Sequence, residues 1–584
     1  MMKKAILLTV FVLINYGWLF AQYNFTTGYY DYAPQTFTES DDRGEDICKL
    51  PRFDMYATAG QYKMGTTDQG IRIGVYNTNG TLVNEITYSL SGYRETAVKI
   101  LTDNNPYSGI NYSVFVVCKT VNDISGAEGM LLLRYSFAKD DLKLVLRKSA
   151  LYSQSGIYNP VDACVTENYD PGDNFNYLNV LCNKKEGTDS KLALYQFNDD
   201  LQINRSYLYN YTDKQRSTYN EIPVRLTYSK STTAGIRYTF CISGGVFNSS
   251  MSKSTPLLIN LNSYDFTPRW VKSGLMNYGR NIYNDILVLN WEWLSNRGEV
   301  LTCGVQSSAA SSSLWNVSSI DLETGATIKS ITYGDNSSYS EALRLTLTSN
   351  NKINVAGFKK TSVKEVKLIT GLYPLDINSG IYYNPVTLPY ESAIKDITFT
   401  DGGTKAIFAG QKKSGAINTA YLYLTDDFGN MNYQDFVSTT SSGFNAVADI
   451  DGDRFAATGY QFGSLQFWEN NRFITRIYNR SVASKSAGAA SAVQTQTQTQ
   501  LLFQNSSNPF NSTTVIRYRI PASSANAILV INNAVGATIK SFTLTGAGNG
   551  TVTISAGELS AGIYNYTLII DGKKTDSKKM ILIK

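Results

Sequence analysis

The sequence contains no histidine in 584 residues. This absence excludes serine or cysteine nucleophiles activated by an imidazole, histidine general bases and most catalytic zinc sites. Any catalysis would have to depend on aspartate, glutamate, tyrosine, lysine or arginine. The residue inventory predicts no cofactor and leaves open whether the chain is an enzyme, although it favours a binding protein.

Blocks of lysine or arginine are also absent, although the formal net charge is +5. The charge pattern of a nucleic-acid binder is therefore missing, and we expect no nucleic-acid partner. Prolines number only 13, against 44 glycines and 41 tyrosines, in a chain 43% hydrophobic. Such a composition is typical of several domains built mostly from β-strands.

The N-terminus has the features of a secretory signal. Lys3 and Lys4 precede an apolar run over residues 5–20, and Ala21 provides a small residue for cleavage before Gln22. The alternative, a membrane anchor, is less favoured because the run is short for a bilayer and no basic stop-transfer cluster follows it. We predict a signal peptide over residues 1–21 and no transmembrane helix in the mature chain.

A short apolar strand ending in a small residue recurs along the chain. A second apolar strand precedes it in each copy. The small column that we assign comprises Ala59, Cys118, Cys182, Cys241, Cys303, Ala356, Ala409 and Thr458. The preceding apolar column comprises Cys48, Val98, Cys164, Val224, Leu287, Leu343, Ile394 and Val447. The midpoints between partners fall on turn-forming residues such as those of DIDGDR, 449–454, so each pair predicts a hairpin.

Two further strands follow each hairpin, for example residues 191–198 or 419–427 and then 327–334 or 472–479. Four strands in each repeat predict an all-β fold, a β-propeller of about eight four-stranded blades over residues 45–480. Seven blades are the alternative if the first repeat is irregular. Residues 22–44 either add a strand that closes the ring or are disordered.

All six cysteines fall in these two columns, where other repeats carry small or aliphatic residues, so they are interpreted as buried thiols. Cys164 and Cys182 are the exception, because the assumed register makes them cross-strand partners and hence a candidate disulfide. DIDGDR shares alternating carboxylates with a calcium loop, but its glycine comes too early and no distal glutamate closes it. We therefore predict no metal site.

Acidic or polar residues begin the innermost strand of most repeats. This end of a propeller strand borders the central channel, so the side chains could form a ligand site at its mouth, or simply keep the strand entrance solvated. The candidates are Asp46, Glu95, Asp162, Glu221, Asp285, Glu341, Glu391 and Asn445. Trp291 and Trp293, with Trp315 and Trp468 as further candidates, could stack on sugar rings or pack between blades.

Residues 481–500 contain almost no large apolar side chain and predict a flexible linker. The remaining segment, residues 501–584, has a two-faced strand pattern with NG and DG turns, which predicts a separate small β-sandwich. Its characteristic residues are Gln504, Asn505, Asn508, Pro509, Phe510, Gly562, Tyr564, Tyr566, Asp571, Gly572, Lys573, Lys579 and Met580.

Together these residues resemble the type A C-terminal sorting domain of the type IX secretion system. One departure is Ser507, where many members carry proline. The resemblance implies transit through the periplasm, an outer-membrane translocon as partner, and cleavage by a surface sortase-like peptidase. It also implies a final location at the cell surface or outside the cell.

The functional expectation is a secreted or surface-attached propeller that binds a glycan or protein ligand. Two alternatives stay open: a carboxylate-based glycosidase or lyase, and a structural component of the cell surface.

Overall fold

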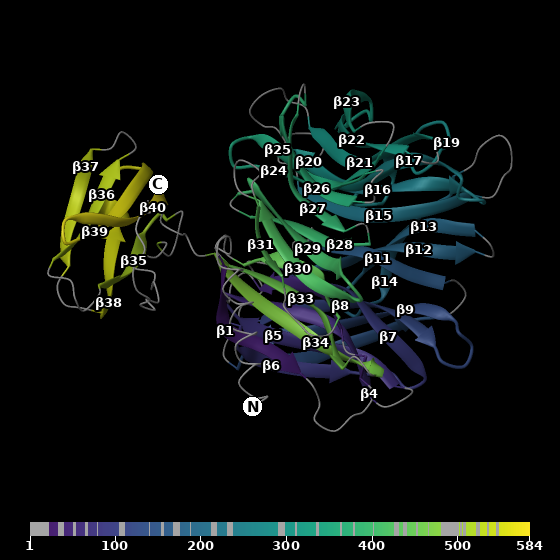
Figure 1. The fold of residues 1–584 in the computed structure, drawn as a ribbon, viewed down its shortest axis with the longest axis horizontal. Coiled ribbons are helices and arrows are strands. Elements are labelled where there is room, and N and C mark those ends of the chain that lie inside the picture. Colours follow the sequence, from purple (N-terminus) through teal and green to yellow (C-terminus); the bar gives the residue numbers. More distant parts are fainter. Residues whose placement is uncertain are drawn as a thin grey trace, which may run out of the picture. The chain divides into compact units, whose positions relative to one another are not determined.

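A computed structural model of the protein describes residues 23–583 apart from short gaps, of which the longer are 33–39, 104–110, 167–175, 212–218, 231–237, 290–297, 426–430, 436–440, 481–501 and 521–525. The chain divides into two compact units between Ala483 and Ser484. Figure 1 labels the strands of both units. Over the described ranges, no helix has the length and hydropathy needed to cross a membrane.

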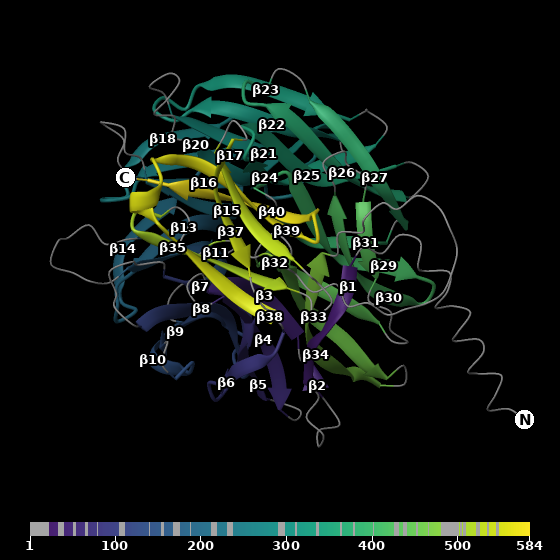
Figure 2. The same ribbon diagram turned by 90° about the vertical axis from the view of Figure 1, so that its left-hand side faces the viewer.

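The first unit is a β-propeller, as predicted. Its described strands form successive antiparallel sets of four, arranged around a ring in Figure 2. Blade 1 comprises β3 (Arg43–Leu50), β4 (Met55–Met64), β5 (Asp68–Asn77) and β6 (Leu82–Tyr88). Blade 2 comprises β7 (Tyr93–Thr102), β8 (Asn111–Asn122), β9 (Glu128–Ala138) and β10 (Leu144–Tyr152). Blade 3 comprises β11 (Ile157–Thr166), β12 (Tyr177–Glu186), β13 (Asp189–Phe197) and β14 (Ile203–Tyr209). Blade 4 comprises β15 (Tyr219–Lys230), β16 (Tyr238–Asn248), β17 (Lys253–Asn262) and β18 (Pro268–Ser273), with the short β19 (Asn277–Tyr278) beside β17.

The chain continues in the same order around the ring. Blade 5 comprises β20 (Ile282–Leu289), β21 (Glu299–Ala309), β22 (Ser312–Asp321) and β23 (Thr327–Tyr333). Blade 6 comprises β24 (Tyr339–Leu347), β25 (Lys352–Lys360), β26 (Glu365–Pro374) and β27 (Ile381–Pro389). Blade 7 comprises β28 (Ala393–Thr400), β29 (Lys405–Ser414), β30 (Ile417–Thr425) and β31 (Met431–Asp435). Blade 8 comprises β32 (Ser442–Asp449), β33 (Arg454–Ser464), β34 (Phe467–Arg480) and β1 (Tyr23–Tyr32), with β2 (Ser40–Asp41) also pairing with β34.

The N-terminal strand closes the ring. β1 pairs antiparallel with β34, from Tyr23 opposite Arg480 to Tyr32 opposite Phe473. The two ends of the propeller sequence thus share one blade, to which Tyr23–Tyr32 and Ser40–Asp41 both contribute.

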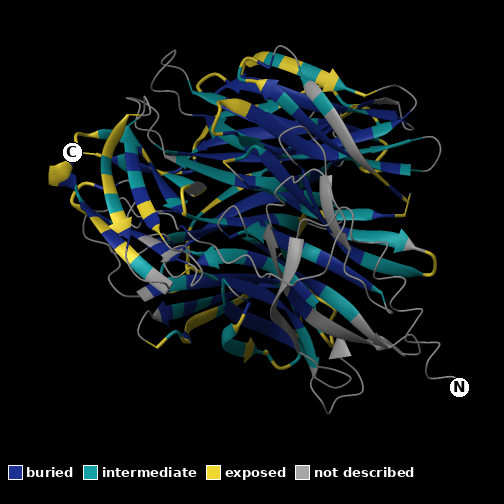
Figure 3. Ribbon diagram, turned by 60° about the vertical axis from the view of Figure 1, so that its left-hand side comes forward, coloured by how far each residue is buried: buried dark blue, intermediate teal, exposed yellow. Residues whose placement is uncertain are grey.

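Burial follows strand position within each blade. The middle strand β13 has the pattern iiBBBBBBB, whereas the outermost strands β14 and β23 both alternate as eeieiei. Figure 3 shows the same gradient, with buried residues inside and exposed ones on the outer strands. Hydrophobic burial between neighbouring blades therefore holds the ring together.

Each innermost strand carries a β-bulge at the same place. The ladder to the second strand shifts between Gly44 and Asp46, Ala97 and Lys99, Pro160 and Asp162, Pro223 and Arg225, Tyr283 and Asp285, Ala342 and Arg344, Ile394 and Asp396, and Phe444 and Ala446. The residue opposite the start of each bulge is Gly60, Cys118, Cys182, Gly244, Gly304, Gly357, Gly410 or Gly459. A Cβ at Gly304 would lie 2.0 Å from the carbonyl oxygen of Ile282, and one at Gly357 would lie 2.1 Å from that of Glu341. This set shares only Cys118 and Cys182 with the small column assigned from the sequence. In the other six blades the residue that faces the bulge is a glycine that lies one to three positions after the assigned one.

The bulge makes the predicted disulfide wrong. An extra residue in the innermost strand shifts the register, so Cys164 lies opposite Asn179 and Cys182 lies opposite Pro160. All six cysteines are free thiols, with Cys118, Cys182, Cys241 and Cys303 buried. Burial raises the pKa of Cys48 and of Cys241 to about 12, which keeps these sulfurs protonated and unreactive.

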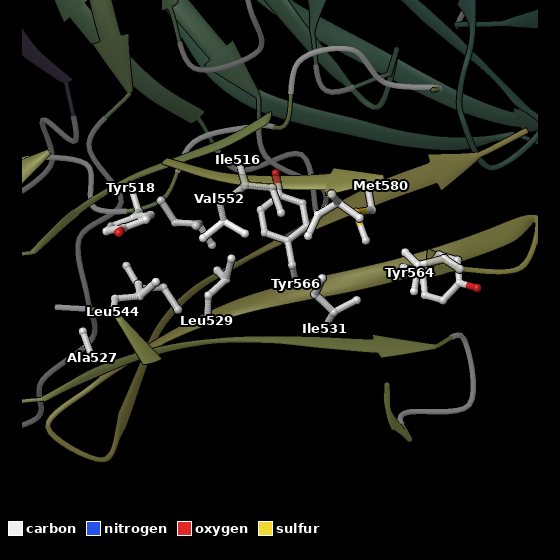
Figure 4. Close-up of a cluster of buried hydrophobic side chains, with 14 of the residues drawn as sticks. Ile516, Tyr518, Ala527, Leu529, Ile531, Leu544, Val552, Tyr564, Tyr566 and Met580 are labelled. Carbon is white, nitrogen blue, oxygen red and sulfur yellow. The ribbon is translucent and has the colours of Figure 1, made fainter. Parts of the chain in front are cut away.

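The second unit is the predicted small β-sandwich. A two-stranded sheet of β35 (Thr513–Ile520) and β38 (Gly548–Ser555) packs on a four-stranded sheet, β37 (Thr538–Leu544), β36 (Ala527–Asn533), β39 (Gly562–Ile570) and β40 (Lys573–Leu582). A 3₁₀ turn, Ala556–Glu558, follows β38. Figure 4 shows Ile516, Val552 and Tyr566 directed into the core between the sheets, and all three belong to one buried cluster.

Candidate functional site

Charged residues of alternating sign follow the bulges around the propeller. The bulge is a common device for re-aiming a side chain, and here it acts on the strands that border the central channel. In blade order the positions are Asp46, Lys99, Asp162, Arg225, Asp285, Arg344, Asp396 and Ala446. We call the seven charged members the charged ring.

Ion pairs connect neighbouring members of the charged ring. Arg225 bonds Asp285 through Nε at 3.1 Å and lies 3.9 Å from Asp162 through an Nη atom. Lys99 lies 3.6 Å from Asp46. Arg344 lies 3.5 Å from Asp396. The cations thus occupy positions between aspartates of adjacent blades.

Each aspartate of the ring also holds the backbone of the next blade. Asp46 accepts from the amide of Ile100 at 2.8 Å, and Asp162 accepts from that of Leu226 at 2.9 Å. The same bond recurs from Leu345 to Asp285 at 2.9 Å and from Val447 to Asp396 at 3.0 Å. These four bonds join blades 1 and 2, 3 and 4, 5 and 6, and 7 and 8.

The eighth position of the ring breaks the alternation. Ala446 stands where blades 2, 4 and 6 carry a cation, so Asp396 and Asp46 flank an uncharged position. Burial raises the pKa of Asp46 against the opposing effect of Lys99, and the charge of Asp396 raises it further. Asp46 raises the pKa of Lys99, and Asp396 in blade 7 makes a smaller contribution in the same direction. The charge of Lys99 is therefore affected by an aspartate that does not belong to a neighbouring blade.

The structure brings only three of the eight predicted channel residues into the charged ring: Asp46, Asp162 and Asp285. Asp396 and the three cations were not predicted, because the prediction took acidic or polar residues at the very start of the innermost strand, whereas these four residues lie further along it, after the bulge. In these four blades the charged residue lies three to five positions after the predicted acid, and with Asp46, Asp162 and Asp285 its sign alternates from repeat to repeat.

The remaining predicted acids do not lie at equivalent positions, which corrects that part of the prediction. Glu95 and Glu221 are fully buried and accept from the amides of Leu90 at 2.8 Å and Tyr211 at 2.7 Å, so they hold the connection from the preceding blade. Glu341 accepts from the Tyr339 hydroxyl at 2.7 Å and pairs with Arg280 at 3.2 Å. These three glutamates therefore stabilise the junctions between blades.

Glu391 and Asn445 have different surroundings again. The Glu391 side chain is 69% exposed and lies 3.3 Å from Lys413. Asn445 is the extra residue of the blade 8 bulge and donates to the carbonyl of Gly44 at 3.0 Å. Neither side chain belongs to the charged ring.

Glu221 provides a titration test of this arrangement. Burial raises the pKa of its carboxyl to about 7, although the Tyr211 amide and Lys191 oppose the rise. A raised acid pKa means that the stabilising contribution is complete below the unfolded value near 4.5 and is lost as pH rises to about 7. Glu221→Gln keeps an acceptor for the amide and does not titrate, so it should exceed the wild type in stability above pH 7 by up to about 3 kcal/mol.

The measurement is urea denaturation of both proteins between pH 4 and 8. The free energies of unfolding of the two proteins should be nearly equal near pH 4, and the advantage of Glu221→Gln should grow as the pH rises. A difference that stays constant across this range would contradict the assignment.

Of the tryptophans, Trp291 and Trp293 lie outside the described residues, as does the side chain of Trp468. Trp315 is fully buried and makes edge contacts with Tyr333 and Tyr382, with ring centroids 6.2 and 6.4 Å away. It packs in the interior of blades 5 and 6, which is the second of the two alternatives given for the tryptophans, and it cannot serve as a stacking platform for a sugar.

Several sorting-domain residues have structural roles within the second unit. Phe510 is buried, and its amide donates to the carbonyl of Ile581 at 2.9 Å. This bond attaches the chain at Phe510, before β35, to β40. Asp571 and Gly572 adopt φ of 49° and 75°, as the tight turn between β39 and β40 requires. Tyr564 donates to the carbonyl of Ser560 at 2.8 Å.

The other members of that motif are placed as follows. Gly562 begins β39, Lys573 begins β40, and Lys579 is exposed on β40 opposite Asn565. Asn508 and Pro509 lie outside the described residues.

In the described part of the chain, no group of three or more cysteine or carboxylate side chains is arranged to hold a metal ion.

No family model matches the chain, and no curated protein matches it. Among solved structures, Sqt1 of Chaetomium thermophilum is similar at 10% identity and a TM-score of 0.42, over 77% of this chain and 97% of that one. The WD40 domain of SCAP from fission yeast gives 8% and 0.39 over 79% and 99%. An α-L-arabinanase of Penicillium chrysogenum, complexed with arabinobiose, gives 12% and 0.32 over 55% and 98%. At these scores the likenesses decide nothing about activity, and the propeller assignment stands on the strand order above.

Proposed function

We propose that this protein is a binding module of the cell surface or exterior, exported by the type IX route. The observation that carries the binding proposal is that the aspartates of the charged ring are already engaged in contacts within the scaffold. Each aspartate of the charged ring accepts a backbone amide of the next blade and lies beside a cation, so these acids hold the scaffold together. Recognition of a ligand then falls to the ends of the propeller.

One end differs between the two halves of the ring. Between the innermost and second strands, blades 2 to 5 have long connections, residues 103–110, 167–176, 231–237 and 290–298. The corresponding connections of blades 1, 6, 7 and 8 are short, residues 51–54, 348–351, 401–404 and 450–453. Binding residues often lie on loops that a rigid scaffold positions, and this set includes Trp291 and Trp293.

A glycan array probed with the mature protein tests the proposal. We expect binding to at least one glycan, and we expect Trp291→Ala with Trp293→Ala to weaken it about thirtyfold, since stacking contributes of order 1 kcal/mol for each of the two aromatic contacts. Trp315 is an unsuitable control because it is buried, so Tyr264→Ala, an exposed aromatic of blade 4, provides the matched variant. An array without binding would favour a structural component of the surface.

A glycosidase is the second candidate, and it is favoured by the interruption at Ala446. There two carboxylates, Asp46 and Asp396, have no ring cation between them, and Asp46 has a raised pKa, as a general acid needs. The same polysaccharides should be tested for hydrolysis with Asp46→Asn and Asp396→Asn as comparisons. Product release that both substitutions abolish would replace the binding proposal.

The export proposal rests on the separate folding unit at the C-terminus and the motif residues built into it. Deleting residues 501–584 should leave the protein inside the outer membrane, measured by protease accessibility on intact cells. The control is Lys540→Ala, which removes an exposed pair with Glu558 within the same unit and should leave export unchanged. Surface display of the truncated chain would contradict the sorting assignment.

A further inference from the structure

A lysine, an asparagine and a buried glutamate meet where blade 3 joins blade 4. We propose that an isopeptide bond forms there between the side chains of Lys191 and Asn210, with Glu221 transferring the protons. The bond would connect β13 covalently to the end of β14, the outermost strand of blade 3. Because it is a modification of the chain itself, this inference goes beyond the proposed function and does not depend on the ligand.

The ladders of the two blades bring the three side chains together. The antiparallel ladder of β13 and β14 ends with Leu192 opposite Tyr209. Lys191 and Asn210 are the next residues along that ladder, and directly opposed residues of a sheet have side chains close enough to interact. A parallel bridge from β13 to β15 adds Glu221 from blade 4. The Lys191 Nζ atom donates to Asn210 Oδ1 at 2.6 Å and lies 3.9 Å from Glu221 Oε1.

Water is largely excluded from the amine and the carboxyl. The Lys191 side chain is 10% exposed and the Glu221 side chain 0%. Burial, and next the charge of Glu221, raise the pKa of the Tyr209 hydroxyl, so this ring lies near the carboxyl. The Glu221 Oε1 atom accepts from the Tyr211 amide, whereas Oε2 is buried and has no hydrogen-bond partner among the described residues. A buried polar atom without a partner is costly, and a role in proton transfer explains it here.

Burial also gives the Glu221 carboxyl the proton affinity that the reaction needs. It raises the pKa of this group to about 7, so the carboxylate can take up a proton and return it near neutral pH. A lysine amine is a nucleophile only in its neutral form, and a site with little water favours the neutral forms of both partners. Proton transfer from the Lys191 ammonium to Glu221 thus prepares the attack.

Atoms and charges balance without a further reactant. The neutral Lys191 nitrogen attacks Cγ of Asn210, where a new C–N bond forms. The bond from Cγ to the amide nitrogen Nδ2 then breaks. Glu221 passes both protons that the lysine nitrogen has lost to the leaving nitrogen, which departs as ammonium. The ammonium and carboxamide groups are thereby converted into a secondary amide, and no oxidant or second substrate is consumed.

The equivalent blade junctions show that the fold does not require this lysine. In blades 1 and 2 the registers place Gly70 and Ser89 where blades 3 and 4 have the lysine and the asparagine. A buried glutamate, Glu95, is enough to hold the connection there. In blades 5 and 6 the same two places are taken by Leu314 and Gly334. The lysine and the asparagine are therefore additions to this one junction, beside a glutamate that recurs.

A covalent link here would secure the outer edge of blade 3. The side chains of β14 are exposed or half-buried, and elements with few buried contacts open most readily. A bond between residues 191 and 210 would limit that opening, because a cross-link that closes a loop restricts the unfolded chain. All six cysteines are free thiols, so a disulfide does not do this. An amide, unlike a disulfide, also withstands reduction.

Tandem mass spectrometry of tryptic peptides from the purified mature chain tests the inference. The linked product is the peptide that carries Lys191, uncut after this residue, joined with loss of ammonia to peptide 206–214, which carries Asn210. Lys191→Arg keeps a cation that can donate to the asparagine but has no amine nucleophile. Glu221→Gln keeps an acceptor for the backbone amide and cannot carry the proton. Lys148→Arg is the matched control, because Lys148 pairs with Asp200 at 2.7 Å on the exposed surface.

We expect the linked peptide in the wild type and in the control, none in Lys191→Arg, and at least about tenfold less in Glu221→Gln, because general acid–base catalysis contributes on the order of a hundredfold or more. Circular dichroism verifies that each variant is folded. Asn210→Ala, at an exposed position, provides a second variant that should fold and lack the link. Cyclisation of an N-terminal Gln22 would also release ammonia, so the linked peptide decides and the intact mass does not.

A wild-type chain without the linked peptide after prolonged incubation would overturn the inference. An equal yield in Glu221→Gln, or a link from Lys191 to another residue, would overturn it as well. The higher stability expected for Glu221→Gln above pH 7 refers to the chain in which this bond has not formed, and the same peptide analysis identifies that form.

Discussion

Replacing Asp285 with alanine should lower the free energy of unfolding by about 3–5 kcal/mol, the cost typical of removing one partner of a buried ion pair. The side chain is 9% exposed, bonds Arg225 at 3.1 Å and accepts from the Leu345 amide at 2.9 Å. Its loss leaves that amide unsatisfied and leaves Arg225 with the more distant Asp162. Two blade junctions, 4–5 and 5–6, are weakened together.

Urea denaturation of the full chain measures the effect. Asp123→Ala is the control, because Asp123 pairs with Arg94 at 3.2 Å where both side chains are solvent-accessible, and its loss should cost less than about 1 kcal/mol. If the two variants were equally stable, the charged ring would have no role in holding the blades.

Gly304→Ala should destabilise the propeller by about 3 kcal/mol or more, at the upper end of overpacking effects. The added Cβ would lie 2.0 Å from the carbonyl oxygen of Ile282, and that contact is with backbone that cannot turn aside. The bulge of β20 would have to flatten or the ladder to β21 would have to separate. Either change moves Asp285, which follows the bulge, out of the charged ring.

Thermal unfolding of Gly304→Ala and of Gly357→Ala, the equivalent position in blade 6, provides the test. Gly557→Ala serves as control for the substitution itself, since nothing lies closer than 3.8 Å to its added Cβ. A melting temperature unchanged in both blade variants would mean that the close approach at the bulge is not a constraint.

The architecture could be predicted because each blade repeats the same pattern of apolar strands that must be buried. Apolar strands such as β8 and β16 must be covered on both faces, so their residues recur at a regular spacing that the sequence displays. The turns are equally visible, since Gly402 and Gly403 both have positive φ and mark the β28–β29 hairpin. The sandwich was predictable from the Asp571–Gly572 turn and the inward alternation of Tyr564 and Tyr566.

The charged ring could not be predicted at that level. A bulge leaves no distinctive residue in the innermost strand, yet it shifts the facing direction of everything after it. The predicted pairing of Cys164 with Cys182 is wrong because it did not include the extra residue of this bulge. The glycine at positions 304, 357, 410 and 459 is the trace the bulge leaves on the neighbouring strand, and it can be interpreted only once the close approach of the backbone is known.

The alternation of sign in the charged ring has a consequence for how such a protein can change size. Aspartate bonds run from odd to even blades only, and the buried glutamates Glu95, Glu221 and Glu341 begin even blades only. The chain is thus a series of double blades. Gaining or losing one double blade would preserve the order of charges, whereas gaining or losing a single blade would set two like charges side by side. The last double blade carries Ala446 in place of the cation. The gain or loss of a double blade at this place would therefore disturb the fewest ion pairs of the charged ring.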